Sequence, residues 1–206
     1  SAGLVGGHAD WKVVARFGIP AALAAILGAW LLEKLAGAGT LATYSLGSRA
    51  CTISAVKLVV AVVIGAFAAL ELSPGFAKLS FPPRFIPVGG AISGFFGGIS
   101  GHQGALRSAF LLRLGLTKER FVATGKMTAI VIDLARLAVY GLTINVGLAS
   151  FREHGGIGLV IAASLAAFAG SVIGARSLRK VKIEGLRRLI GVMLIVMALA
   201  LGAGAI

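Results

Sequence analysis

Six long apolar stretches, separated by basic connections, constrain this chain more than any other feature of its sequence. They run from Val13 to Leu35, Ile53 to Leu72, Phe85 to Leu114, Phe121 to Leu142, Ile157 to Ala175 and Leu186 to Ala205. A helix that crosses a membrane needs about 20 mostly apolar residues, and each stretch approaches or exceeds that length. We therefore expect an all-α fold, a polytopic bundle of about six transmembrane helices.

The composition excludes the main alternatives to a membrane protein. Hydrophobic residues make up 58% of the chain and charged residues 13%, whereas soluble domains carry about 25% charged residues. Disordered chains have the opposite balance of few apolar and many charged residues. Cys51 is the single cysteine, so a disulfide-stabilised scaffold is excluded as well.

The formal net charge of +13 lies mostly in the connections between apolar stretches, where Lys and Arg set membrane topology. If the third stretch crosses once, five basic residues face one side and a larger group faces the other. The five are Lys12, Arg16, Lys78, Arg84 and Arg152, and the larger group is Lys34, Arg49, Lys57, Arg113, Lys118, Arg120, Arg176, Arg179, Lys180, Lys182, Arg187 and Arg188. We expect the larger group on the cytoplasmic side and both chain ends outside. A re-entrant third stretch would invalidate this assignment for one half.

Glycine interrupts the third stretch in two ways. Gly90, Gly94 and Gly98 are four residues apart, a spacing that lets two helix backbones approach closely. The run Gly97-Gly98-Ile99-Ser100-Gly101-His102-Gln103-Gly104 then breaks the apolar pattern. We expect either two half-helices around an unwound turn or a re-entrant hairpin followed by a helix.

The polar residues of this break predict an anion site. Ser100, His102 and Gln103 are costly at membrane depth unless they are buried in protein or hydrated. The N-terminus of a half-helix carries partial positive charge, and Arg107, one turn further, adds a full charge. The structural alternative is that His102 merely hydrogen-bonds backbone carbonyls.

Ionisable residues also occur inside the fourth stretch. Lys126, Asp133 and Arg136 fall on one helical stripe, and such groups usually face the bundle interior or a water-filled cavity. With Thr128 they form our candidate set for coupling or intramembrane charge. An Asp133–Arg136 ion pair that only fixes helix packing is the structural alternative, and the two interpretations are compatible.

A weak internal repeat suggests a duplicated architecture. Residues 21–35 resemble residues 167–181, with Gly28 matching Gly174. We expect one transmembrane domain over residues 1–206. Residues 1–72 would be the remnant of a first repeat whose first two helices are not in this chain, and residues 85–206 the second repeat of a two-repeat transporter fold.

Residues 89–114, GGAISGFFGGISGHQGALRSAFLLRLGL, resemble the glycine-rich motif of the sulfite exporter TauE/SafE family, and ATGKMTA at 123–129 sits where the family's next helix begins. The resemblance implies a multi-pass permease of the inner (plasma) membrane that moves sulfite, sulfoacetate, thiosulfate or similar organosulfonates. It places substrate binding on Gly98, Ser100, Gly101, His102, Gln103, Gly104 and Arg107. The sequence departs from the family in lacking a first copy of the motif and in its His102-Gln103 pair.

Two alternatives to a transporter remain open at this point. Gly98-Ile99-Ser100-Gly101 matches the Gly-x-Ser-Gly pattern of rhomboid intramembrane serine proteases, although that chemistry needs a general base within reach. A channel or scaffold would leave Asp133 and Arg136 structural. We expect no enzyme activity, no cofactor, no metal and no nucleic-acid partner; the expected partners are a small anion and the lipid bilayer, and a homo-oligomer stays open.

Overall fold

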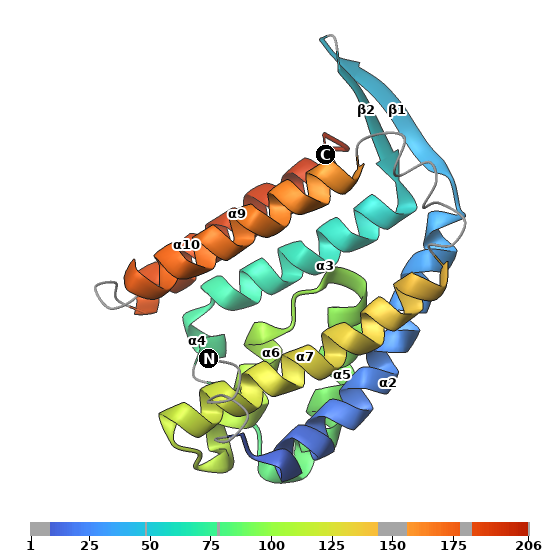
Figure 1. The fold of residues 1–206 in the computed structure, drawn as a ribbon. Helices are drawn as coiled ribbons and strands as arrows, with labels where there is room; N and C mark the ends of the chain where they lie inside the picture. The colour runs from blue at the N-terminus through green and yellow to red at the C-terminus, as the bar shows by residue number, and fades with distance from the viewer. Residues whose placement is uncertain (1–8, 48, 78, 144–155, 178–182, 206) are drawn as a thin grey trace.

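The computed structural model describes residues 9–205 except 48, 78, 144–155 and 178–182, and it is mostly helical (Figure 1). The helices are α2 (Trp11–Ala36), α3 (Ala55–Leu72), α4 (Pro74–Ala77), α5 (Ile86–Ser100), α6 (Gly104–Leu111), α7 (Lys118–Thr143), α9 (Gly156–Ser177) and α10 (Ile183–Gly202), with 3₁₀ turns η1 (Pro83–Phe85) and η2 (Leu112–Leu114). Among the described helices, α2 and α3 are long and apolar enough to cross a membrane. The third apolar stretch divides into α5 and α6.

The all-α prediction is wrong for the connection between α2 and α3. Strands β1 (Thr40–Leu46) and β2 (Arg49–Ser54) pair antiparallel there and project from one end of the bundle (Figure 1). The strands hold Thr, Tyr and Ile, residue types that favour extended structure, and Gly47 adopts the positive φ of 64° that a tight turn requires. Ile53, the predicted start of a helix, therefore lies in β2, and Ser54 caps α3 by accepting a hydrogen bond from the Lys57 N–H at 3.3 Å.

The helices form two groups that meet around α6. Helix α2 packs along α5 and α7, and helix α3 packs along α10. Figure 1 shows α6 and the turn before it between these groups. The described residues of α9 are exposed and, apart from Ser164, apolar, as Leu165 and Phe168 are, which suits a lipid-facing surface.

Glycine makes the contact between α2 and α5 unusually close. A Cβ atom on Gly90, Gly94 or Gly98 would lie closer than 3.0 Å to a backbone carbonyl oxygen of α2, in Phe17, Ala21 and Ala25 respectively. The residue numbers of these contacts increase together along α5 and α2, so the two helices run parallel. The predicted glycine face is therefore a helix-packing surface.

Helices α5 and α6 form a hairpin that returns to its own starting end. The Phe110 ring of α6 stacks on Phe81, which precedes α5, with ring centroids 4.3 Å apart, and the Phe81 N–H donates to the Ala109 carbonyl at 3.2 Å. Helix α5 has 15 residues, which rise about 22 Å, short of the roughly 30 Å of a bilayer core. The third stretch therefore contains features of both predicted arrangements: two short helices around an unwound turn, folded back on each other as a hairpin.

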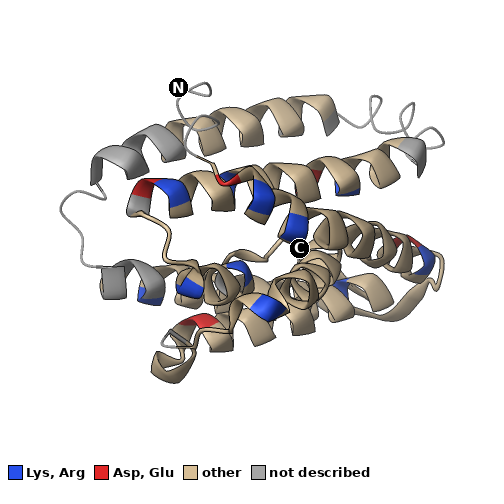
Figure 2. Cartoon of the chain, turned by 90° about the horizontal axis from the view of Figure 1, so that it is seen from below, with Lys and Arg blue, Asp and Glu red and all other residues tan. Residues whose placement is uncertain are grey.

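The hairpin corrects the predicted distribution of charge. We call the end where α2, α5 and α7 begin the Trp11 end, and the opposite end, from which β1 and β2 project, the strand end. The predicted larger basic group divides between these two ends, because the third apolar stretch does not run from one end of the bundle to the other. The strand end holds Lys34, Arg49 and Lys57, whereas the Trp11 end holds Lys12, Arg16, Arg84, Arg113, Lys118, Arg120 and Arg188. Figure 2 shows that Lys and Arg outnumber Asp and Glu along the chain, and that most of the chain carries no charge. Of the remaining basic connections, residues 78, 152, 179, 180 and 182 lie outside the described part of the chain.

Candidate functional site

The break between α5 and α6 is shorter than predicted. Helix α5 continues through Gly97, Gly98 and Ser100, so only residues 101–103 are unwound. Gly101 ends the helix with φ of 74°, and its N–H donates to the Gly97 carbonyl at 2.8 Å. Gly104 then opens α6. The turn places the last carbonyls of one helix beside the first N–H groups of the next.

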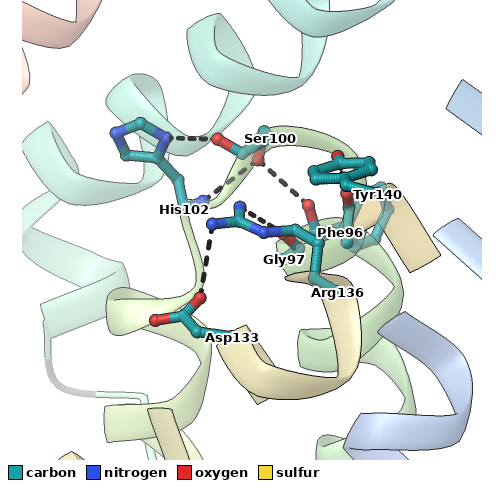
Figure 3. A network of polar contacts seen from close by, with 8 residues as sticks. Phe96, Gly97, Ser100, His102, Asp133, Arg136 and Tyr140 are labelled. Atoms are coloured by element: carbon teal, nitrogen blue, oxygen red, sulfur yellow. Dashed lines mark hydrogen bonds and ion pairs between the residues drawn. The ribbon is translucent and has the colours of Figure 1, made fainter. Parts of the chain in front are cut away.

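Ser100 and His102 hold the turn through local hydrogen bonds (Figure 3). The Ser100 hydroxyl donates to the Phe96 carbonyl at 3.0 Å and accepts from the His102 N–H at 3.2 Å. The His102 Nδ1 lies 3.0 Å from the Ser100 carbonyl oxygen; because a carbonyl only accepts, Nδ1 carries the proton. The imidazole therefore contacts the Ser100 backbone and not its hydroxyl. This geometry offers no support for the serine-protease alternative.

Helix α7 caps the end of α5 with two polar side chains (Figure 3). Arg136 Nη1 donates to the Gly97 carbonyl at 3.4 Å, and the Tyr140 hydroxyl donates to the Gly98 carbonyl at 3.1 Å. Arg136 Nη2 lies 3.5 Å from Asp133 Oδ1, so the predicted ion pair is present. A cation at a helix C-terminus is favourable because the terminal carbonyls carry partial negative charge. The predicted α7 stripe thus faces the break.

Arg107 extends from α6 toward α7. It lines a cavity of about 190 Å³ with Ser108, Phe121, Gly125 and Lys126. Its neighbour Gly125 leaves room for the guanidinium, whose Nε lies 3.6 Å from where a Cβ atom would be. The cavity therefore brings together Arg107 and Lys126, which the sequence placed in two separate candidate groups.

Three buried polar atoms of this region have no hydrogen-bond partner. Over the described residues they are Gln103 Oε1, Arg107 Nη1 and Arg136 Nε, and all belong to predicted site residues. Gln103 is 5% exposed, and its side chain packs against Gly97. A buried polar group left unpaired costs about 1–3 kcal/mol, and more when it is charged. The region is thus suited to a polar ligand that supplies the missing partners.

Three of the predicted residues have other surroundings. Thr128 is fully buried, and its hydroxyl donates to the Thr124 carbonyl at 2.7 Å. Gly98 packs against α2, and Gly104 is exposed with nothing near the position of its absent Cβ. The structure therefore places Arg107 and Lys126 in one cavity, Gln103 in the turn after α5, and the Asp133–Arg136 pair against the end of α5.

A larger cavity of about 620 Å³ adjoins the break. Its polar lining residues are His102, Gln103 and Ser108 beside the break and Glu71 on α3. The remaining lining comes mainly from α3, α10 and the region of α6, namely Phe67, Phe76, Leu79, Gly104, Ala109, Leu112, Phe121, Ile190 and Leu194. Sequence reasoning missed this lining, because apolar residues on distant helices give no local signal of a cavity.

Comparison with known proteins gives one match. The sequence model of the family described as Sulfite exporter TauE/SafE matches residues 2–201. No curated protein and no solved structure matches the chain. The match spans all the site residues and all the helices described above, except for Gly202 at the end of α10.

Proposed function

Because the chain belongs to the sulfite exporter TauE/SafE family, a family of membrane transporters, we propose that it carries small sulfur-containing oxyanions across the membrane. Candidate substrates are sulfite, thiosulfate, sulfoacetate and similar organosulfonates. The proposed site is the α5–α6 break with the facing part of α7. The observation that carries the proposal is the set of unpaired buried atoms on Gln103, Arg107 and Arg136.

Arg107 has the clearest role in this proposal. Its Nη1 is buried without a partner, so an oxyanion oxygen would complete the hydrogen bonding of the guanidinium. Charge-assisted hydrogen bonds of this kind are roughly twice as strong as neutral ones. Lys126 lines the same cavity and would add a second positive charge near the anion.

Gln103 and the α7 pair would complete the site. The Gln103 Oε1 only accepts hydrogen bonds, so it would pair with water or with the O–H of a singly protonated oxyanion. Arg136 is held by Asp133 and the Gly97 carbonyl and would present its free N–H edge to the break.

Asp133 and His102 are the proposed proton-coupling groups, and Asp133→Asn or His102→Gln should then flatten the pH dependence of uptake into proteoliposomes. An unaltered pH profile in both variants would exclude this coupling.

We place the protein in the plasma (inner) membrane with the Trp11 end in the cytoplasm, since Lys and Arg concentrate there. The test uses single cysteines on a Cys51→Ser background. A membrane-impermeant maleimide should label Ser45→Cys in intact cells, and Lys12→Cys only after lysis. The reverse pattern would overturn this orientation.

The decisive experiment on function is thermal unfolding of detergent-purified protein with sulfite, sulfate, thiosulfate, sulfoacetate and chloride. A ligand that binds only the folded state stabilises it by about 2.7 kcal/mol at 100 times its dissociation constant. We expect a selective rise in Tm that Arg107→Ala removes. The control Arg113→Ala removes the same charge from an exposed residue and should keep the response.

Two outcomes would contradict the proposed function. One is that none of the anions raises the Tm of the unsubstituted protein. The other is that Arg107→Ala responds as fully as Arg113→Ala does. Arg107→Lys separates charge from geometry, because Lys keeps the charge and lacks the bidentate fork.

A further inference from the structure

The hairpin of β1 and β2 has two outer edges, and its own chain occupies one of them. On β2, the Thr52 N–H donates to the Gly204 carbonyl at 3.3 Å, and the Thr52 carbonyl accepts from Lys57 Nζ at 3.0 Å. A Cβ atom on Gly204 would lie 2.6 Å from the Thr52 carbonyl oxygen, so the two backbones are in direct contact. The C-terminal segment and Lys57 therefore close the outer edge of β2 at Thr52.

The outer edge of β1 is open. Thr43 lies directly opposite Thr52, and directly opposed residues of an antiparallel pair either exchange both hydrogen bonds or exchange none. Because the N–H and carbonyl of Thr52 bond outside the hairpin, those of Thr43 also point away from the partner strand, as do those of Ser45 two residues further along. In the described part of the chain, no backbone hydrogen bond from outside the hairpin reaches them.

The sequence of β1 does little to protect this edge. Natural edge strands carry charged side chains, proline or bulges that prevent pairing with another chain. The seven residues of β1, TLATYSL, include no charge and no proline, although the chain has a net charge of +13. The one irregularity in the register lies at the base of the strand, between Thr40 and Ala42. From Thr40 to Ser45 every residue is exposed, so the middle of β1 is accessible to a further strand.

A further strand would also stabilise the hairpin. Two strands alone are marginally stable in water, whereas three or more strands form a stable sheet. Figure 1 shows both strands extending beyond the ends of the helices, where the bundle does not cover them. The free N–H and carbonyl groups of an edge strand are matched by the backbone of another strand. The open edge therefore fits an extended segment of protein.

We infer that β1 pairs with β1 of a second copy of this chain, antiparallel and about a two-fold axis. Full overlap of the two strands puts Thr43 opposite Thr43, and Thr–Thr pairs favour sheet formation. Because β1 carries no charge, the strands meet without repulsion between like charges. The closed edge of β2 ends the sheet at four strands, so the assembly closes at two copies.

The membrane brings the two strands together without a further protein. Two copies in one bilayer hold β1 on the same side and at the same height. The axis that relates them runs along the membrane normal, and it makes two strands antiparallel when they lie across it. Figure 1 shows the hairpin leaning away from the direction of α2, as this arrangement requires. The interface lies at the strand end and is separate from the candidate anion site.

Disulfide trapping in cell membranes tests the register of the pairing. Opposed residues that exchange hydrogen bonds have Cα atoms about 5.5 Å apart, within the roughly 4.4–6.8 Å that a disulfide spans. On a Cys51→Ser background, Thr43→Cys should form a covalent dimer under mild oxidation. Ala50→Cys is the matched control, because Ala50 is exposed on β2 of the same hairpin. Its two copies would lie three strand spacings apart, about 14 Å, and should not cross-link.

Subunit counting by single-molecule photobleaching of the full chain in lipid vesicles tests the dimer itself. The unsubstituted protein should show mainly two bleaching steps. Thr43→Lys should shift the population to one step, since equal charges directly opposite each other destabilise a strand pair. Ala50→Lys adds the same charge to β2 and should keep two steps. An unaltered Tm of Thr43→Lys would show that its fold is intact.

Four results would overturn this inference. One is a single bleaching step for the unsubstituted protein, and another is a dimer that persists in Thr43→Lys and so uses a different surface. A third is equal cross-linking of Thr43→Cys and Ala50→Cys, which would indicate random collision. The last is a cross-linked product of Thr43→Cys whose mass is not twice that of the chain, which would identify a different protein as the partner of β1.

Discussion

Gly94 and Gly104 belong to the same glycine-rich segment, but their surroundings differ completely. A Cβ atom on Gly94 would lie closer than 3.0 Å to the Ala21 carbonyl oxygen, whereas one on Gly104 would meet nothing within 4 Å. The α5 glycines thus allow two helix backbones to touch. The glycines around the turn allow the chain to reverse and leave space beside α6. One residue type therefore serves packing in the first region and site construction in the second.

The largest effect should come from Gly94→Ala. The new methyl group would overlap a backbone carbonyl, which cannot move aside as a side chain can. We expect a loss of more than about 3 kcal/mol in the free energy of unfolding, above the usual 1–3 kcal/mol for overpacking. Fluorescence-detected size exclusion and thermal unfolding would measure it.

Gly104→Ala is the control for this prediction, since it makes the same chemical change in open space. Its Tm should stay within a few degrees of the unsubstituted protein. Equal losses in the two variants would show that the close contact between α2 and α5 does not determine stability.

An intermediate effect is expected at Gly101, which belongs to the turn but also contacts α7. Its φ is 74°, and a Cβ atom would lie 2.6 Å from Arg136 Nη1. Alanine should cost about 1–3 kcal/mol through its backbone conformation and should also displace Arg136. We therefore expect Gly101→Ala to lower both the Tm and the anion-dependent rise in Tm.

Gly115→Ala separates these two effects. Gly115 has a similar φ of 64° and nothing within 4 Å of its absent Cβ, so alanine there should lower stability and leave anion binding intact. If both variants lose the anion response, the loss reflects general destabilisation and not the position of Arg136.

The smallest effect on stability is expected when the hydroxyl group of one of two tyrosines is removed. The Tyr140 hydroxyl donates to the Gly98 carbonyl within the bundle, and the Tyr44 hydroxyl donates to the Ala203 carbonyl at the exposed strands. One hydrogen bond contributes about 1 kcal/mol, and water can replace it where the group is exposed. Tyr140→Phe should therefore lower stability by about 1 kcal/mol, and Tyr44→Phe by less, in matched thermal unfolding. A larger loss for Tyr44→Phe would contradict this ranking.

Several residues of the candidate site stand out in the sequence because their signals are local. Glycine, serine and histidine within one apolar stretch mark a break at any membrane depth, and the charges of α7 stand out against their apolar neighbours. The narrower limits of the break could not be predicted, since Gly97 and Gly98 remain helical and only Gly101 ends α5. The strands β1 and β2 were not predicted, because a search for stretches long enough to span a membrane does not detect a hairpin in the connection between two of them.

The sequence by itself determined the membrane class, most of the helical segments and the approximate location of the break, because hydropathy and glycine content act over neighbouring residues. Only the tertiary structure decided that α6 turns back. A glycine-rich break permits either direction, and the choice depends on Phe110 stacking on Phe81 across 29 positions of sequence. That reversal also reassigns the basic residues to the Trp11 end, brings Arg107 to α7 and forms the adjoining cavities. These features arise from contacts between distant segments, whose partners a linear pattern does not specify.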